Sequence, residues 1–326
     1  MASNFKFLET DFPSLANFGD LAEKYCYTDP NSCLMKLGMI GETIVNLMFK
    51  YDKIPLPYDN TAATRINVLA SEGLLTKDLI DILHALRKVR NKAAHENYSE
   101  ASDCPIFLQM TYSLSEWFMQ TYGDWNYQHQ DFVMPTKEAE KKDEQMNASS
   151  RMQEEKKEEE LTKAAIACAE QAEKVDRKVR QTQANKMASQ RQKSEAETRY
   201  MIDEQLRQVG WEANTQEICY AKGTRPMKGR NMAIAEWPTD SSASKKGYAD
   251  YALFVGTKLV GIIEAKAEHK DIPSVIDYQG KDYPRNIRKE DAKYQIGTWG
   301  EFKVPFTFAT NGRPYLEQFK IKSGIW

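Results

Sequence analysis

The chain contains a run of 74 residues, from Thr136 to Val209, without a single glycine or proline. The run opens as KEAEKKDEQMNASSRMQEEKKEEELTKAA, which consists of good helix formers and charges of both signs. As one helix it would span about 110 Å. Its apolar positions Leu161, Ile166, Val175 and Val179 do not keep a heptad, which disfavours a long coiled coil. We therefore expect a charged linker over 136–193, either a solvated helix or a disordered tether, between two domains.

Length and composition agree with two domains. Domains usually hold roughly 100–200 residues, so 326 residues are enough for two. The composition, 41% hydrophobic and 28% charged, is that of a globular protein. The first residues lack the basic and apolar regions of a signal peptide, and no unbroken apolar run reaches the ~18 residues of a membrane helix, so we expect a cytoplasmic protein with no membrane partner. Five scattered cysteines without a C-x-x-C pair support neither zinc nor disulfides. The net charge of -2 leaves DNA binding undecided.

Residues 1–135 carry the apolar spacing of an all-helical bundle. Apolar side chains recur at steps of three and four residues, which places them on one face of a helix. Three helices are predicted, with the apolar positions Leu34, Leu37, Ile40, Ile44, Leu47 and Met48 in the first, Leu79, Ile82, Leu83, Leu86 and Val89 in the second, and Phe107, Met110, Leu114 and Trp117 in the third. Pro55 and Pro57 separate the first two helices, because proline cannot continue a helix.

Residues 194–326 are predicted to form an α/β domain on a small mixed sheet. The segment SEAETRYMIDEQLRQVGW is an amphipathic helix that stops at Gly210. Two strands, Tyr248 to Val255 and Lys258 to Ala265, follow and are joined by a turn at Gly256 and Thr257. A further helix is expected between Ile272 and Gln295, and a strand from Val304. The fold class is therefore multi-domain, α followed by α/β.

The second strand carries the most informative polar residues, Glu264 and Lys266. They are two residues apart, so both project from one face of an otherwise apolar strand. Asp250 lies across the tight hairpin, where its carboxylate can approach that of Glu264. Magnesium relieves the repulsion of two such carboxylates, because it prefers hard oxygen ligands, and a lysine beside it can orient or deprotonate an attacking water. The pattern predicts a phosphodiester hydrolysis site; the alternative is a hairpin with an ordinary surface Glu-x-Lys pair.

Asp250, fourteen residues before Glu264, and the run LVGII before Glu264-Ala-Lys266 resemble the PD-(D/E)xK nuclease superfamily, with Ala249-Asp250 in place of Pro-Asp. The resemblance implies magnesium held by Asp250 and Glu264 and catalysis with Lys266. Glu195 or Glu197, in the helix before the strands, could be a further acidic group of the site. Equally, the two could begin a solvated helix with Ser194 as its N-cap.

Downstream, Gln279-Gly-Lys-Asp-Tyr283 resembles the Q-x-x-x-Y motif of the motor subunits of type I restriction enzymes, and PFTFATNGRPYLEQ followed by KSGIW resembles the end of their nuclease domain. The resemblance adds Gln279 and Tyr283 to the catalytic groups, covers 194–326, and implies double-stranded DNA and the modification and specificity subunits as partners. In a helix both side chains would share one face, and we expect Tyr283 to be its last residue because Pro284 follows. No G-x-x-x-x-G-K-[ST] loop occurs, so we expect an N-terminal portion in which ATP would act only through motor domains that these residues lack.

A second motif, Arg90-Asn-Lys-Ala-Ala-His95, resembles the R-x(4)-H motif of HEPN-type helical domains. That resemblance implies either a metal-independent ribonuclease, with the arginine on a phosphate and the histidine moving a proton, or a partner-binding module of a defence system. The alternative is a helix end whose basic side chains complement the helix dipole. The leading hypothesis for the chain remains a magnesium-dependent DNA endonuclease at Asp250, Glu264 and Lys266.

Basic residues flank the expected nuclease site. Gathered along one groove, they would bind DNA without regard to sequence; scattered, they would be solvated surface charges. They are Lys245, Lys246, Lys270, Lys281, Arg285, Arg288 and Lys289.

Overall fold

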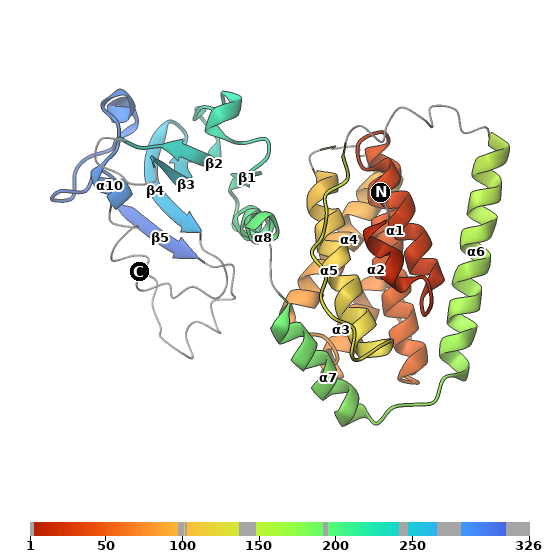
Figure 1. The fold of residues 1–326 in the computed structure, drawn as a ribbon. Coiled ribbons are helices and arrows are strands. Elements are labelled where there is room, and N and C mark those ends of the chain that lie inside the picture. Colours follow the sequence, from red (N-terminus) through yellow and green to blue (C-terminus); the bar gives the residue numbers. More distant parts are fainter. Residues whose placement is uncertain are drawn as a thin grey trace. The chain divides into compact units, whose positions relative to one another are not determined.

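A computed structural model describes residues 3–96, 101, 103–136, 148–191, 195–240, 247–265 and 282–310. The chain forms two compact units, 1–192 and 193–326 (Figure 1).

The first unit is helical. Its elements are η1 (Asn4–Leu8), α1 (Pro13–Tyr25), α2 (Pro30–Tyr51), α3 (Ala62–Ser71), α4 (Lys77–Glu96), α5 (Asp103–Tyr122), α6 (Ala148–Gln171) and α7 (Arg177–Gln190). The three helices predicted from apolar spacing are confirmed as α2, α4 and α5. Their apolar stripes form the core, in which Leu37, Leu86 and Leu114 are fully buried. Asp29 and Thr61 cap α2 and α3 by accepting a backbone N–H of the first turn.

Helix α2 is long and apolar enough to cross a membrane by length and composition. It is the one such helix in the part of the chain that the structure describes. Of its most apolar window, 67% is buried against the rest of the bundle, as expected of a core helix.

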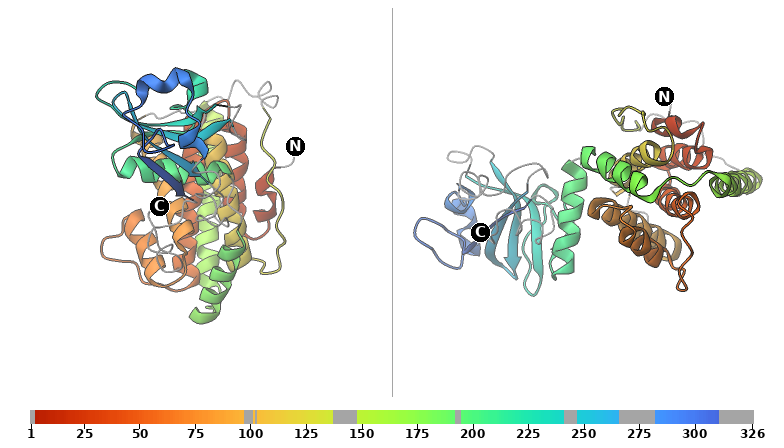
Figure 2. Two further views of the ribbon diagram at one scale, coloured as in Figure 1. Left: turned by 90° about the vertical axis from the view of Figure 1, so that its left-hand side faces the viewer. Right: turned by 90° about the horizontal axis from the view of Figure 1, so that it is seen from below.

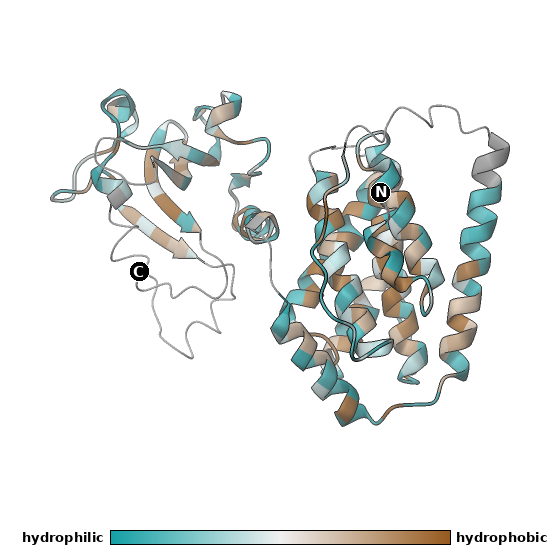
Figure 3. Ribbon diagram, viewed as in Figure 1, coloured by the Kyte–Doolittle hydropathy of each residue, from teal (hydrophilic) through white to brown (hydrophobic). Residues whose placement is uncertain are grey.

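The expected linker over 136–193 differs from the structure, because α6 and α7 pack on the bundle. Ala169, Ala184 and Met187 are buried, and Trp117 of α5 donates from Nε1 to the carbonyl of Ala184 at 3.0 Å. Charged residues dominate the middle turns of α6, and apolar ones are more frequent in its later turns (Figure 3). Lys36 of α2 forms an ion pair with Glu158 of this helix. Small apolar side chains and specific polar contacts anchor a segment whose charge and missing heptad indicated a solvated one.

Arg180 of α7 is the main polar anchor of this segment. It is 3% exposed, and its Nε lies 3.5 Å from Oδ1 of Asp52, which is 1% exposed. The guanidinium also donates to the carbonyl of Thr121 and stacks 4.2 Å from the ring centroid of Tyr122. Tyr122 in turn donates to Oδ2 of Asp52 at 2.7 Å. The buried charges of Arg180 and Asp52 are thus paired with one another and also contact neutral polar groups, which offsets the cost of burying an ion pair.

The second unit is built on a five-stranded sheet in the order β1-β2-β3-β4-β5. The strands are β1 (Glu212–Ala213), β2 (Asn231–Pro238), β3 (Tyr248–Val255), β4 (Lys258–Ala265) and β5 (Phe306–Thr310). Pairs β1–β2 and β4–β5 are parallel and the two central pairs antiparallel, so the predicted mixed sheet is confirmed. The bounds of β3 and β4 are those predicted, and Gly256 at their turn has a φ of 59°, which glycine adopts without strain. Strands β1 and β2 were not predicted from the sequence.

Each face of the sheet carries its own core. Helix α8 (Glu195–Gln208) covers one face, where Ile202 and Leu206 pack on Tyr251 and Ile263 (Figure 2). The other face packs against α10 (Asp282–Arg285) and the segment that follows it, which includes η5 (Lys289–Tyr294). The short η3 (Tyr220–Lys222) lies at the edge of that second core. The ends of β3 and β4 are therefore enclosed between elements on both faces.

Candidate functional site

Asp250 and Glu264 come together at the ends of the central hairpin. Tyr251 pairs with Ile263, so Asp250 and Glu264 are the next residues of their strands. Asp250 is 1% exposed and Glu264 fully buried. The backbone N–H of Ala265 donates to Oδ2 of Asp250 at 2.8 Å, which ties the carboxylate of β3 to the end of β4. The register therefore places Asp250 and Glu264 opposite one another on adjacent strands.

The neighbouring strand β2 is kinked beside Asp250. Glu236 has a φ of 54°, a left-handed conformation that residues other than glycine rarely adopt. Ala235 and Trp237 are two residues apart, yet they belong to the cores on opposite faces of the sheet. Their partners Tyr251 and Ala249 in β3 change faces at the same place. The regular alternation of side chains between the two faces of the sheet is therefore interrupted at Glu236 in β2 and at Asp250 in β3. Backbone strain of this kind is concentrated at functional sites.

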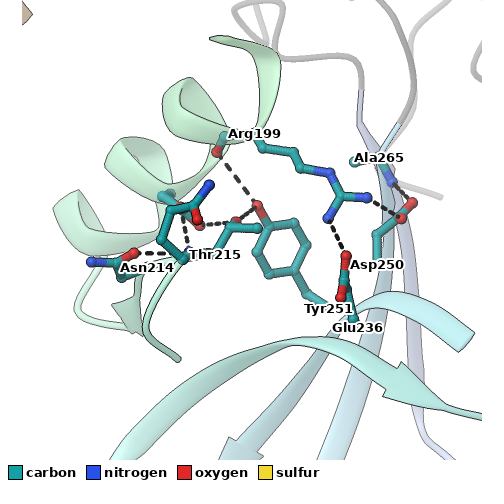
Figure 4. Close-up of polar contacts among 9 residues, drawn as sticks. Arg199, Asn214, Thr215, Glu236, Asp250, Tyr251 and Ala265 are labelled. Carbon is teal, nitrogen blue, oxygen red and sulfur yellow. Dashed lines mark hydrogen bonds and ion pairs between the residues drawn. The ribbon is translucent and has the colours of Figure 1, made fainter. Parts of the chain in front are cut away.

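Arg199 of α8 joins the carboxylates of β2 and β3. Its Nη2 lies 3.4 Å from Oδ1 of Asp250 and its Nη1 lies 3.5 Å from Oε1 of Glu236 (Figure 4). The Arg199 side chain is only 13% exposed. The guanidinium thus supplies positive charge to two carboxylates in a largely enclosed place, where electrostatic interactions are stronger than in water.

A hydrogen-bond chain holds α8, and with it Arg199, against the sheet. The Thr215 N–H donates to Oδ2 of Asp203 at 2.7 Å, and the Thr215 and Tyr251 hydroxyls lie 2.8 Å apart. The Tyr251 hydroxyl is also 3.4 Å from the carbonyl of Arg199 (Figure 4). Burial raises the pKa of Asp203, while the two hydrogen bonds from Thr215 oppose that shift.

Tyr283 lies against the carboxylate of Glu264 from the other face. It is 2% exposed and hydrogen-bonded to Glu264. Burial, followed by the negative charges of Glu264 and Asp250, raises the pKa of the phenol, so the neutral hydroxyl donates to the carboxylate. The prediction that Tyr283 ends its helix is wrong, because α10 runs from Asp282 to Arg285. Pro284 fits there because the first turn of a helix needs no amide donor.

The other predicted site residues are only partly described. Lys266 and Gln279 lie outside the described residues. In α8, Glu197 is 2% exposed, so the alternative that it lies in a solvated first turn is wrong for this residue. The side chain of Glu195 lies outside the described residues. Arg199 and Glu236 are contacts that sequence reasoning missed. Neither belonged to a motif, and the proximity of both to Asp250 depends on the docking of α8 and on the kink in β2.

Of the basic residues expected to flank the site, the structure describes three. Arg288 pairs with Asp291 at 2.9 Å, and Arg285 pairs with Glu301 at 2.5 Å. Lys289 is exposed. Two of these three charges are therefore engaged within the unit, and the groove remains a prediction that depends mainly on residues outside the described ones.

The donor chemistry of Asp250 and Glu264 fits a hard divalent cation. Their carboxylates supply the oxygen ligands that magnesium prefers, and two such donors complete part of an octahedron. Among the described residues there is no group of three or more histidine, cysteine or acidic side chains that could hold a metal. The fit is therefore that of a two-carboxylate site rather than of an all-protein cage.

In the helical unit, Arg90 and His95 lie in different surroundings. Arg90 lines a pocket between helices, and its Nη1 lies 2.9 Å from Oε2 of Glu42. His95 is exposed in the last turn of α4 and does not line that pocket.

Comparison with known proteins finds a similarity to the endonuclease subunit of a type I restriction enzyme. A family model described as the second domain of the type I restriction enzyme EcoKI endonuclease subunit matches residues 212–326. A domain of unknown function, DUF4145, matches residues 20–153.

Over 99% of its length, the chain is 27% identical to the type I restriction enzyme EcoKI endonuclease subunit of Escherichia coli K12. The chain spans about a third of that relative's length, 34%. No solved structure matches.

Proposed function

We propose that this chain carries the endonuclease site of a type I restriction enzyme and hydrolyses phosphodiester bonds of double-stranded DNA with magnesium. The observation that carries the proposal is the pair of buried carboxylates, Asp250 and Glu264, at adjacent strand ends of a chain related to a restriction endonuclease subunit. In this proposal the protein acts in the cytoplasm with modification and specificity subunits, and ATP serves only motor domains outside these residues.

In the proposed site, Asp250 and Glu264 would hold the magnesium. The bound ion would polarise the scissile phosphate and offset its developing charge. Arg199 and the Ala265 N–H orient the Asp250 carboxylate, and Tyr283 orients that of Glu264. Lys266 would orient or deprotonate the attacking water, and Gln279 would contact the DNA beside it. The enclosure of both carboxylates favours pre-organisation, because neither needs to be gathered from solvent when substrate arrives.

Calorimetric titration of the 326-residue chain with manganese tests the site directly. We expect wild type to bind in the micromolar to millimolar range, roughly, because two carboxylates complete only part of the coordination sphere. Asp250→Asn removes one charged donor with little change of shape and should bind at least about tenfold more weakly. The matched control is Asp203→Asn, a buried carboxylate of the same unit that bonds Thr215 instead. Equal binding by Asp250→Asn and wild type would overturn the metal assignment.

Cleavage is tested separately. Supercoiled plasmid incubated with magnesium and the chain, with and without the partner subunits, should be nicked or linearised by wild type and by Asp203→Asn but not by Glu264→Gln. Cleavage retained by Glu264→Gln at the wild-type rate would overturn the proposed function even where metal binding is found.

A further inference from the structure

A pocket of about 470 Å³ lies between α2, α3 and α4 of the helical unit, in a region that the proposed nuclease does not use. Its apolar wall is formed by Val45 of α2, Ile66 of α3, and Leu83 and Leu86 of α4. The volume is that of sites that enclose small organic ligands, which cover roughly 300–1,000 Å³.

Two glycines of α2 let α4 approach closely at this place. A Cβ on Gly38 would lie 2.3 Å from the Cβ of Arg90, and one on Gly41 would lie 3.2 Å from Cδ1 of Leu86. The stem of Arg90 therefore lies directly on the backbone of α2, and its head reaches Glu42 at the pocket wall. Sequence spacing around these glycines gave no indication of a cavity.

Three arginines line the pocket, and the single acidic residue among its lining groups is Glu42. Arg90 is paired with Glu42, whereas Arg65 donates to the neutral amides of Asn46 and Asn60 and has no ion pair with any described residue. Arg87 is half-buried and, among the residues that the structure describes, has neither an ion pair nor a hydrogen bond. The lining groups therefore carry a net formal charge of +2.

The surroundings of Arg87 reflect this excess of positive charge. Burial first, and then the charge of Arg87, lower the pKa of His84 one turn earlier on α4. The N-terminus of α3, which begins at Ala62 after the cap Thr61, adds the positive end of a helix dipole to the same wall.

We propose that this pocket binds a small ligand in which a phosphate group is attached to an apolar body. A phosphate monoester carries a charge of about −1.5 to −2 near neutral pH, which matches the net charge of the lining groups. Guanidinium groups bind phosphate oxygens in pairs, and Arg87 and Arg65 supply them without first breaking an ion pair. The apolar wall takes the body of the ligand. His95 has no part in this site, which separates the proposal from a ribonuclease at Arg90 and His95.

Phenyl phosphate is the probe, with inorganic phosphate and phenol as its two halves. In calorimetric titrations of the 326-residue chain at low salt, phenyl phosphate should bind at least about tenfold more tightly than either half, because charged hydrogen bonds and apolar burial both contribute. Arg87→Gln should weaken phenyl phosphate binding about tenfold or more. Among the described residues Arg87 has no ion pair or hydrogen bond to lose, so this variant should keep a melting temperature close to that of wild type. Lys88→Gln is the matched control, since it removes an exposed charge next along α4 and should bind as wild type.

Ala63→Trp provides a second, independent variant, because the indole would fill the pocket from α3 and abolish binding of phenyl phosphate. Three results would each overturn the proposal: no binding of phenyl phosphate to wild type, unchanged binding by Arg87→Gln, or inorganic phosphate binding as tightly as phenyl phosphate. The last would leave a simple anion site, such as one for a macromolecular phosphate, in place of the proposed ligand. None of these results depends on the nuclease, whose residues lie in the other unit.

Discussion

The guanidinium of Arg199 lies 3.4 Å from the carboxylate of Asp250, although 51 residues separate them in sequence. Both side chains are largely enclosed, so the contact joins the helix on one face of the sheet to the end of its central hairpin. A positive charge therefore lies beside the carboxylate that is proposed above to bind the metal.

We expect Arg199→Gln to destabilise the second unit by about 3 kcal/mol, because it leaves Asp250 buried without this ion pair. Arg199→Lys should cost less, since it keeps the charge. Scanning calorimetry would measure the change, with the exposed Arg225→Gln as control. If Arg199→Gln melts at the wild-type temperature, the contact has no role in holding α8 to the site.

In Tyr283→Phe, the free energy of unfolding should decrease less at alkaline pH than it does in wild type. The folded state raises the pKa of Tyr283 above that of an unfolded tyrosine, which is about 10. The contribution of the neutral phenol is therefore fully present below pH ~10 and is lost as the pH rises further. Urea unfolding at pH 8 and at pH 10.5 would show a smaller difference for Tyr283→Phe than for wild type, whereas Tyr58→Phe, at a fully exposed position, should behave as wild type. An unchanged difference for Tyr283→Phe would contradict the buried hydrogen bond to Glu264.

Arg180→Ala should release α7 from the helical unit. The change leaves the Asp52 charge buried without its ion pair, at a cost of about 3–5 kcal/mol. Limited trypsin digestion should cut within α7 slowly in wild type and much faster in Arg180→Ala. The exposed Lys178→Ala serves as control. Rapid cleavage of α7 in the wild-type chain would instead support the interpretation of this segment as a solvated linker.

DNA binding by the chain alone should be weak and dependent on salt. Phosphate contacts release counterions, so affinity falls as salt rises, and nonspecific contacts have dissociation constants of about 10⁻⁴ to 10⁻⁶ M. Gel-shift titrations with short duplexes of unrelated sequence at two salt concentrations measure this, and Lys289→Gln should reduce the salt dependence slightly. Binding that is absent at low salt, or indifferent to salt, would exclude the basic groove.

The sequence by itself determined the local elements with a strong period. Apolar steps of three and four residues specified α2, α4 and α5. Two short apolar runs joined by a turn at Gly256 and Thr257 specified β3, β4 and the register that places Asp250 opposite Glu264. These features are local because a helix face or a hairpin register depends on neighbouring residues and on one turn.

Only the tertiary structure decided the remainder. The charged run over 136–193 indicated a solvated segment, yet Arg180 and a few small apolar side chains attach α7 to the bundle. The contacts of Arg199 and Glu236 with the site, the tolerance of Pro284 within α10, and the arginine-lined pocket likewise lack a local pattern. Each of these features depends on contacts between residues far apart in the chain. Such contacts are determined by the packing of the helices and the sheet rather than by the local spacing of residues.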